Sequence, residues 1–371
     1  MKQISVFGCG AMGTNIANLL AENVTRLDDY KNNILWFVRD EECFGERLID
    51  VINGNRENPK YAPNVHLNDN IEAKGDAAAV ASVSDVIFFV YATRHVNEIL
   101  REISGHLKPN VLFISLSKGL LVTEPTETVP DQVIRLVSEE ILRVTKSPCV
   151  VVSGGVNAKG LANGDFAEAT IGCPNPERAE EAKLLLQNQN LMLTCTRDVI
   201  TVEICGALKN ILVLAAGIVD GLRLGTNTKS AVIRLGLYEI GQFCQYMYAK
   251  YDTSYTTLLQ SCGISELFLC LLHRSDVMPQ VGDDFDFFNL IIGRMLAEPR
   301  YAKLSLEEIE RSLHPECVAS GPDCARKVYA RLESMHLTEQ YPLFTAVHLI
   351  CSRQLAAEDL LRMLQNHPAH Q

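Results

Sequence analysis

The first half of the chain alternates short apolar runs with longer amphipathic stretches, and this alternation constrains the fold most. The apolar runs are rich in β-branched residues and cover residues 4–8, 34–38, 86–90, 111–115 and 149–152. Continuous apolar strands separated by helices are typical of a parallel sheet that is covered on both faces. Between residues 53 and 70, the density of Asn, Gly and Pro instead indicates an irregular segment.

After residue 198 the pattern changes to helical periodicity, with few strand signals before the C-terminus. A chain of 371 residues also exceeds what one hydrophobic core usually serves. We therefore expect an α/β protein with two domains. Residues 1–195 should form a doubly wound parallel sheet, and residues 196–371 should form an all-helical domain.

The composition favours a large buried core and excludes several kinds of partner. Hydrophobic residues make up 47% of the chain and charged residues 21%, which argues against global disorder. The formal net charge of −11, without a basic run, argues against binding to nucleic acid. We expect no membrane span, because the longest apolar run, residues 204–219, contains Lys209 and Asn210.

The twelve cysteines are scattered, without a CxxC pair or the His spacing that holds zinc. We expect reduced thiols and no metal site. The first strand begins near residue 4, which leaves no room for a presequence, and the last residues form no peroxisomal signal. By elimination, we expect the protein in the cytoplasm.

A glycine-rich turn directly follows the first apolar run and leads into a helical pattern. The turn consists of Gly8, Cys9, Gly10, Ala11, Met12 and Gly13. Between a strand and a helix, this GxGxxG pattern is typical of dinucleotide binding, because its glycines allow a tight turn, a close pyrophosphate and close helix packing. The amides at the helix N-terminus then face the phosphates. The alternative, glycines that only make a tight turn, is less favoured in this context.

The residues after the second strand bear on the choice of cofactor. Val38 is followed by Arg39 and Asp40. An acid at this place accepts hydrogen bonds from the ribose hydroxyls of NAD, whereas an arginine can pair with the 2′-phosphate of NADP. Both types of side chain are present, so the residues alone leave the choice open.

Lys209 lies in the middle of a segment that is apolar on nearly every side and should form a buried helix. Its helical neighbours Cys205, Gly206, Leu212 and Val213 include no acid. Burying an unpaired ammonium group costs several kcal/mol. Desolvation lowers the pKa of a lysine, so such a group could exchange a proton with a substrate hydroxyl. The alternatives are a lysine that extends to the helix end, or one that pairs with a distant acid.

Two further polar residues are candidates. Lys118 follows the apolar run 111–115, at the carboxyl end of a strand, where open parallel sheets bind their ligands. A lysine in a loop is usually just solvated, but this location favours a place in the site. Asn210, beside Lys209, could contact a substrate or could be an ordinary core amide.

Several ordered blocks of the sequence carry a resemblance to one enzyme family. They are the glycine turn, Lys118 with Gly119, and residues 170–173, 199–210, 227–229, 231–236 and 365–368. With these blocks, the chain resembles the eukaryotic cytosolic NAD-dependent glycerol-3-phosphate dehydrogenases over essentially its whole length. This resemblance favours NAD as the cofactor.

The resemblance implies a Rossmann-type N-terminal domain, a helical substrate domain, a homodimer and no metal. It also implies interconversion of glycerol 3-phosphate and dihydroxyacetone phosphate, with Lys209 as the proton-transfer group at C2 and Lys118 stabilising charge on the reacting oxygen. By position it implies cofactor contacts at Gly8, Cys9, Gly10, Ala11, Met12, Gly13, Val38, Arg39, His95, Lys118, Gly155, Arg274 and Ser275, and substrate contacts at Lys118, Asn210, Glu266, Cys270, Arg274, Ser275 and Asp276.

The chain departs from the family around the phosphate-binding loop. Glu266 and Cys270 stand where the family has aspartate and threonine, and residues 273–276 replace a Gly-Gly-Arg-Asn loop. Two glycines have become bulky residues, which should change the loop conformation. Arg274 lies one position early, and Asp276 would repel a phosphate in the place of the asparagine.

Positions around the nicotinamide differ as well. Residues 92–94 read Ala-Thr-Arg in place of a Pro-His-Gln motif, and His95 stands where an aromatic residue often lines the pocket. Residues 154–157 and 318–320 also differ from the family pattern. Two alternatives to an active glycerol-3-phosphate dehydrogenase therefore stay open. One is a catalytically weakened NAD(H)-binding paralogue that acts by interaction or sensing, and the other is a dehydrogenase of another 2-hydroxy compound.

Overall fold

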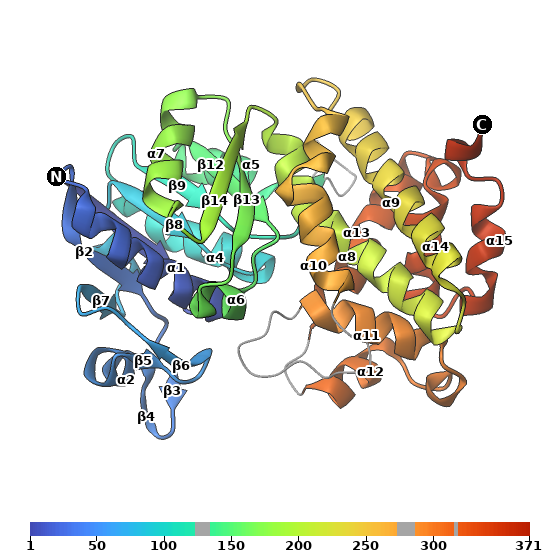
Figure 1. Cartoon of the computed structure of the whole chain (residues 1–371), viewed down its shortest axis with the longest axis horizontal. Helices are drawn as coiled ribbons and strands as arrows, with labels where there is room; N and C mark the ends of the chain where they lie inside the picture. Colours follow the sequence, from blue (N-terminus) through green and yellow to red (C-terminus); the bar gives the residue numbers. More distant parts are fainter. Residues whose placement is uncertain (123–133, 273–285, 315–317) are drawn as a thin grey trace. The chain divides into compact units, whose positions relative to one another are not determined.

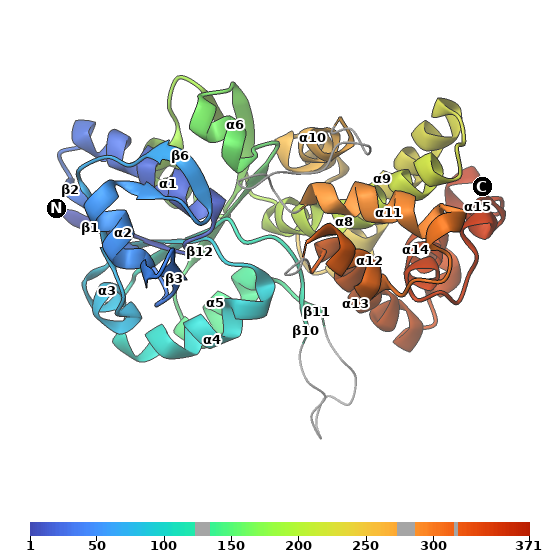
Figure 2. The same ribbon diagram turned by 90° about the horizontal axis from the view of Figure 1, so that it is seen from below.

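The computed structural model describes residues 1–122, 134–272, 286–314 and 318–371 (Figures 1 and 2). These residues form two compact units. The first unit comprises residues 1–118 and 136–203, and the second comprises 119–122, 134–135, 204–272, 286–314 and 318–371. The division between the two units falls between Glu203 and Ile204, within a helix.

An eight-stranded sheet forms the centre of the first unit. Its strand order is β14-β13-β12-β9-β8-β1-β2-β7. Five of its strands lie at the five predicted apolar runs: β1 (Lys2–Phe7), β2 (Tyr30–Phe37), β8 (Val86–Phe89), β9 (Leu112–Ser115) and β12 (Cys149–Gly154). These five are parallel to one another, so the expected parallel sheet is confirmed.

Three outer strands of this sheet were not predicted. They are β7 (Ile71–Lys74), β13 (Ala167–Gly172) and β14 (Leu191–Thr196). Strand β13 runs antiparallel to β12, so the sheet is not wholly parallel. In the edge strand β7, buried and exposed residues alternate. Edge strands therefore lack the continuous apolar run that identified the inner strands.

The segment 53–70 is more regular than its composition indicated. Helix α2 (Leu48–Asn55) extends into it, and β5 (Glu57–Asn58) pairs antiparallel with β6 (Ala62–His66). A second small hairpin, β3 (Glu42–Cys43) with β4 (Glu46–Arg47), precedes them. The prediction of an irregular segment was therefore wrong. The turn residues marked only the short connections between these elements.

Helices cover both faces of the sheet, as Figure 2 shows. Helix α1 (Ala11–Asn23) packs with α6 (Ala158–Asn163) and α7 (Pro176–Leu186) on one face. On the other face, α4 (Thr93–Ile103) packs between α3 (Ala77–Val83) and α5 (Val137–Thr145). This arrangement confirms a doubly wound, Rossmann-type fold.

The second unit is helical, as expected, apart from the small pair β10 (Leu121–Val122) and β11 (Ile134–Arg135). Its helices are α8 (Val199–Gly221), which begins in the first unit, α9 (Thr226–Met247), α10 (Glu266–Leu271), α11 (Asp286–Ala297), α12 (Leu306–Leu313), α13 (Ser320–Ser334), α14 (Pro342–Cys351) and α15 (Leu360–Leu364). Helix α8 is central, and α11 lies directly against it. A Cβ atom on Gly217 of α8 would lie 2.1 Å from the carbonyl oxygen of Leu290 in α11.

Helix α8 is long and apolar enough to cross a membrane, judged by length and composition alone. Its mean hydropathy reaches 1.9 over an 18-residue window, which includes Lys209 and Asn210. Every residue of that window is buried inside the protein. A core helix of this kind passes the same test as a membrane span.

Candidate active site

The glycine turn has a conformation that requires its glycines. Gly8 has a φ of +130°, and a Cβ atom there would lie 2.2 Å from the carbonyl oxygen of Val90. A Cβ atom on Gly13 would lie 2.1 Å from the carbonyl oxygen of Gly8, so helix α1 packs directly on the strand end. Around Gly10, no atom lies within 4 Å of the ideal Cβ position in the described structure. The turn therefore has open space at the glycine that should face a pyrophosphate.

The N-terminus of helix α1 is suited to bind an anion. Gly10 is its N-cap residue, no side chain caps it, and its first turn contains no acidic residue. The first amides of a helix have no acceptor within the helix, and the helix dipole adds positive potential there. The residues present therefore fit the pyrophosphate of a dinucleotide.

Two side chains that sequence reasoning missed hold this turn in place. The indole Nε1 of Trp36, in β2, donates to the carbonyl oxygen of Gly8 over 2.9 Å. The amide Nδ2 of Asn58, in β5, donates to the carbonyl oxygen of Cys9 and to Oγ1 of Thr14, both over 2.9 Å. Trp36 is the only tryptophan of the chain, which was a usable signal, whereas Asn58 lay in the segment read as irregular.

The residues after β2 take different directions. Val38 is buried, and the guanidinium of Arg39 donates to Oε2 of Glu98, in α4, over 2.9 Å. The side chain of Asp40 is 78% exposed and pairs with Arg47. The carboxylate that approaches the glycine turn belongs to Glu41, one position later.

His95 lies in the first turn of α4, beside Arg39 and Arg94. Burial of the imidazole and the charges of these two arginines lower its pKa below the usual range. A neutral imidazole is therefore the dominant form at neutral pH. Its Nε2 accepts from Nε of Arg94 over 3.1 Å and its Nδ1 lies 3.8 Å from Oε2 of Glu98, so the ring face is what it offers to a neighbouring ligand.

Lys118 lines a small apolar cavity of about 40 Å³ at the carboxyl end of the sheet. Met12 of the glycine turn and Gly154, at the end of β12, line the same cavity. Gly155 follows directly after β12 at this end of the strands. Three of the predicted cofactor-binding positions, Met12, Lys118 and Gly155, therefore lie at one end of the first unit's sheet.

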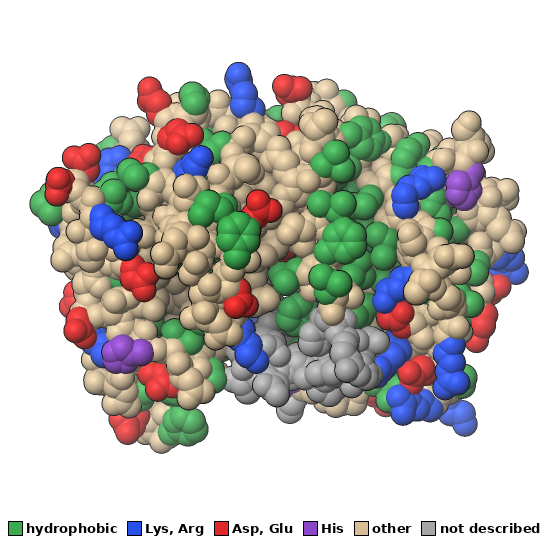
Figure 3. All heavy atoms as spheres, viewed as in Figure 1, with side chains coloured by type: hydrophobic (Ala, Val, Ile, Leu, Met, Phe, Trp, Pro, Cys, Tyr) green, Lys and Arg blue, Asp and Glu red, His purple; other side chains and the backbone are tan. Residues whose placement is uncertain are grey.

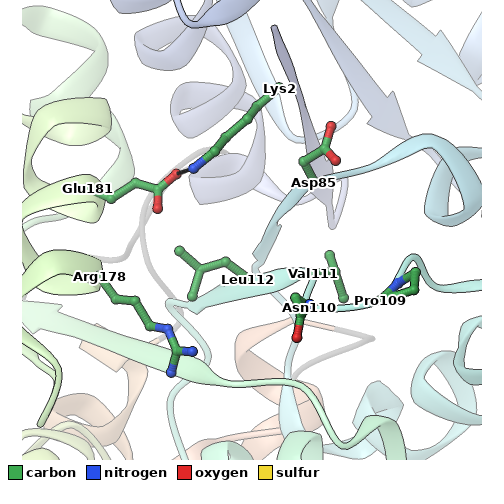
Figure 4. A pocket seen from close by; sticks show the side chains of 8 residues that line it. All are labelled: Lys2, Asp85, Pro109, Asn110, Val111, Leu112, Arg178 and Glu181. Atoms are coloured by element: carbon green, nitrogen blue, oxygen red, sulfur yellow. Dashed lines mark hydrogen bonds and ion pairs between the residues drawn. The ribbon is translucent and has the colours of Figure 1, made fainter.

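A larger hollow, of about 180 Å³, lies at the opposite, amino end of the strands (Figure 4). Lys2 and Glu181 form an ion pair of 2.5 Å on its wall, and Lys108 reaches Asp85 over 3.0 Å. None of the predicted site residues lines it. Open α/β sheets bind ligands at the carboxyl ends of their strands, so we assign no active site to this hollow.

In the second unit, Lys209 is buried and contacts two other predicted residues. Its side chain is 3% exposed, and its ammonium forms an ion pair with the carboxylate of Glu266, which is fully buried. Nζ also lies 3.5 Å from Sγ of Cys270. Lys209 therefore does not extend to solvent. Lys209 pairs with Glu266, which lies 57 positions further along the chain. Pairing with a distant acid was one of the two alternatives considered for this lysine. Glu266 also belongs to the predicted substrate-binding residues.

An unusual turn positions Glu266. Residues Ser261–Ser265 form a single turn of π-helix directly before α10. Within it, a Cβ atom on Gly263 would lie 2.1 Å from the carbonyl oxygen of Leu258, so only glycine fits there. Helix α10 begins at Glu266, and one further turn brings Cys270 to the same ammonium group. Turns of π-helix occur frequently at functional sites.

Asn210 makes the contacts of a core amide. Its oxygen accepts a hydrogen bond from Nδ2 of Asn289 over 3.1 Å, and its own Nδ2 donates to Ala207 over 3.3 Å. Asn289 also holds α13, through Ser320 and the backbone N–H of Gly321. These contacts favour a structural role for Asn210, although its amide keeps a second N–H for a ligand.

Three predicted contacts, Arg274, Ser275 and Asp276, lie outside the described residues. Within the residues that the structure describes, no group of three or more His, Cys, Asp or Glu side chains could hold a metal ion. The eleven cysteines of the same residues are free thiols.

The glycine turn, the doubly wound sheet and a buried lysine in an attached helical unit together define a nucleotide-dependent dehydrogenase of the Rossmann class. Comparison with known proteins specifies the family. Residues 3–179 match the N-terminal domain of the NAD-dependent glycerol-3-phosphate dehydrogenases, and residues 198–362 match their C-terminal domain. The chain belongs to this family.

Similar proteins span the whole chain. It is 34% identical over 372 residues to the cytoplasmic glycerol-3-phosphate dehydrogenase [NAD(+)] of Mus musculus, covering 100% of this chain and 99% of that protein. The enzyme of Drosophila melanogaster is 33% identical, covering 99% and 94%. The solved structure of the Plasmodium falciparum enzyme has a TM-score of 0.85 at 29% identity, covering 98% of this chain and 95% of that chain.

Proposed function

We propose that the protein interconverts glycerol 3-phosphate and dihydroxyacetone phosphate with NAD(H) as its cofactor. Membership of the family supports the reaction. The observation that carries the proposal is the buried ammonium of Lys209 beside Glu266 and Cys270, two residues of the predicted substrate-binding set. The ion pair with Glu266 is the alternative that the sequence left open against proton transfer, so the proposal requires that the substrate oxygen reaches the ammonium beside this carboxylate. A buried, oriented ammonium group is what a proton transfer to a carbonyl oxygen requires.

The roles of the residues follow from their chemistry. Bound NADH supplies the hydride that the C2 carbonyl receives. Lys209 gives a proton to the C2 oxygen during reduction and takes it back during oxidation. Glu266 holds the ammonium in one orientation, so that little rotamer freedom is lost when the substrate binds. Lys118 stabilises negative charge on the reacting oxygen.

We propose the remaining contacts from the resemblance and from the geometry of the first unit. The open space at Gly10 and the uncapped N-terminus of α1 support residues 8–13 as the pyrophosphate site. Val38, Arg39, His95 and Gly155 follow strands β2, β8 and β12 at the carboxyl end of the sheet. This placement supports them as contacts for the rest of the cofactor.

A weakened or redirected enzyme is the second candidate function. The amide oxygen of Asn210 is occupied by Asn289, and Glu266 and Cys270 change the groups around the lysine. These observations favour an altered substrate contact. Turnover of non-phosphorylated 2-hydroxy compounds, or NADH binding without turnover, would support this candidate.

We further propose a homodimer in the cytoplasm. The second unit exposes several large apolar side chains: Tyr246, Tyr251, Leu259, Phe268 and Leu272 are 47% to 80% exposed. Figure 3 shows hydrophobic side chains gathered on one face of this unit. Exposed apolar side chains that gather on one face are typical of protein interfaces. Light scattering on the purified chain tests the dimer, and a monomer at micromolar concentration contradicts it.

Steady-state oxidation of NADH with dihydroxyacetone phosphate tests the proposed reaction. We expect turnover by the wild type, and a loss of turnover by about 10³-fold in Lys209→Met, because the variant removes the proton donor but keeps the apolar stem. The affinity for NADH should stay within about twofold. Lys250→Met, at an exposed position of the same unit, is the matched control. Loss of NADH binding together with turnover would show that Lys209 is structural.

A further inference from the structure

We propose that the hollow at the amino end of the first unit's strands binds a small monocarboxylate, held by Arg178 and Asn110 (Figure 4). This inference goes beyond the proposed function and does not depend on it. Lys2, on the wall of the hollow, begins strand β1, and Gly8 directly follows the end of that strand. The hollow and the glycine turn therefore lie at opposite ends of one strand, and a carboxylate in the hollow leaves the turn accessible to a dinucleotide.

Both acids that line the hollow are already balanced by a cation. The carboxylate of Glu181 pairs with Lys2 and also accepts from the hydroxyl of Tyr30 over 2.8 Å. The carboxylate of Asp85 accepts from Nζ of Lys108 over 3.0 Å. Each negative charge on the wall is therefore compensated within the protein, and neither acid needs a cation from solution.

The guanidinium of Arg178 is the charge that remains. Arg178 lies in the first turn of α7, and its backbone N–H donates to the side chain of Asn175. In the part of the chain that the structure describes, the Arg178 side chain forms no hydrogen bond and no ion pair. Its guanidinium keeps five N–H donors in a planar fork, which matches the two oxygens of a carboxylate.

A second polar side chain on the same wall also has its hydrogen-bonding groups available. The backbone N–H of Val111 donates to the carbonyl oxygen of Lys108 over 3.4 Å, so residues 108–111 form a β-turn. Pro109 and Asn110 are its central residues, and Asn110 has a φ of +62°. Among the described residues, the side-chain amide of Asn110 has no hydrogen-bond partner. The turn thus presents a neutral donor beside the charged one.

The rest of the wall limits the size of the ligand and favours an apolar part. In Figure 4, the buried side chain of Leu112 lies between the pair of Lys2 with Glu181 and the polar groups of Arg178 and Asn110. The volume of about 180 Å³ is below the usual range of ligand pockets, which is about 300 to 1,000 Å³. A dinucleotide is therefore too large, whereas a carboxylate of about four carbons is of suitable size.

Charge favours a monocarboxylate over a phosphate. The cations Lys2, Arg178 and Lys108 and the acids Asp85 and Glu181 together give the hollow a net charge of one positive unit. A monocarboxylate neutralises this charge. A phosphate monoester carries about −2 near neutral pH and would leave a negative charge beside the two acids. An ammonium ligand would instead meet the guanidinium.

Saturation-transfer NMR of the full chain with sodium butanoate tests the inference. We expect saturable binding with a Kd of about 1 mM. Arg178→Gln removes the charged fork and should weaken binding at least about tenfold. Arg101→Gln, at an exposed position of α4, is the matched control and should leave the Kd unchanged. Asn110→Gly permits the positive φ but removes the amide, so it should weaken binding about fivefold.

Two further probes test the chemistry of the ligand. Inorganic phosphate and butylammonium should each bind at least about tenfold more weakly than butanoate. Binding of phosphate that is as tight as that of butanoate and is lost in Arg178→Gln would overturn the assignment to a carboxylate. Equal affinities of Arg178→Gln and Arg101→Gln for butanoate, or no saturation by butanoate up to about 50 mM, would overturn the site itself.

Discussion

The carboxyl group of Glu203 should give the protein a measurable pH dependence of folding stability. Glu203 lies near the start of α8 and is 2% exposed. It accepts hydrogen bonds from the backbone N–H of Ser138, over 3.1 Å, and from the Ser138 hydroxyl, over 2.5 Å. Burial outweighs these hydrogen bonds and raises the pKa of Glu203 from 4.5 to about 7. Its neutral form is therefore the one that the folded protein favours.

The sign and size of the effect follow by linkage. Between pH 4.5 and about 7, the unfolded chain releases a proton that the folded protein retains, so stability falls as pH rises. The contribution is complete below pH 4.5 and absent above about pH 7. Each unit of pKa corresponds to about 1.4 kcal/mol, so the full shift is worth about 3 kcal/mol.

The variant Glu203→Gln removes the titration. Its amide can accept from the N–H of Ser138 and donate to the Ser138 hydroxyl, so the packing is retained. Relative to the wild type, its free energy of unfolding should rise from no difference near pH 4.5 to about 3 kcal/mol above pH 7.

Urea titrations of both proteins at several pH values between 4.5 and 8 measure this difference, and the remaining titratable groups cancel in it. Glu339→Gln, at an exposed position, is the control and should give a flat difference. A constant difference between Glu203→Gln and the wild type across this range would refute the reasoning.

Three other changes test single packing features. Asn58→Ala removes the donor to Cys9 and Thr14. It should lower the free energy of unfolding by about 2 kcal/mol and weaken NADH binding. An unchanged affinity for NADH would mean that the glycine turn keeps its conformation without Asn58. Gly217→Ala forces a Cβ atom against α11 and should destabilise the fold by about 3 kcal/mol or more, measured by urea unfolding against Gly105→Ala, where no atom lies within 4 Å. His367→Ala removes the imidazole that contacts the buried carboxylate of Glu239 over 3.0 Å. We expect the free energy of unfolding to fall by about 3 to 5 kcal/mol. A fall of less than about 1 kcal/mol would contradict a buried pair.

The inner part of the sheet was predictable from the sequence because it is buried on both faces. Strand β8 is apolar at every position, and β1 is buried at every position after its first. Edge strand β7 alternates buried and exposed residues over four positions, which is too short a pattern to separate from a loop. The segment 119–135 gave no signal that its ends belong with the second unit, because that association depends on tertiary contacts.

The candidate site was predictable where a charged residue lies within an apolar segment. Lys209 stood out because a cation in an apolar helix needs an explanation. Its contact with Glu266 could not be derived from periodicity, because the two lie 57 positions apart in the sequence and a turn of π-helix directly precedes Glu266.

The burial of α8 also has a consequence for biosynthesis. Its partners include α9, α11 and α13, so the helix is covered only after translation has reached about residue 334. Until then the nascent chain carries an uncovered segment of 23 residues that, by length and composition alone, resembles a membrane span. Lys209 lies at the middle of this segment, where a cation disfavours insertion by about 3 kcal/mol. We therefore expect Lys209 to disfavour insertion of this segment into a bilayer, and a comparison of the wild-type and Lys209→Leu segments in a translocation assay would measure the effect.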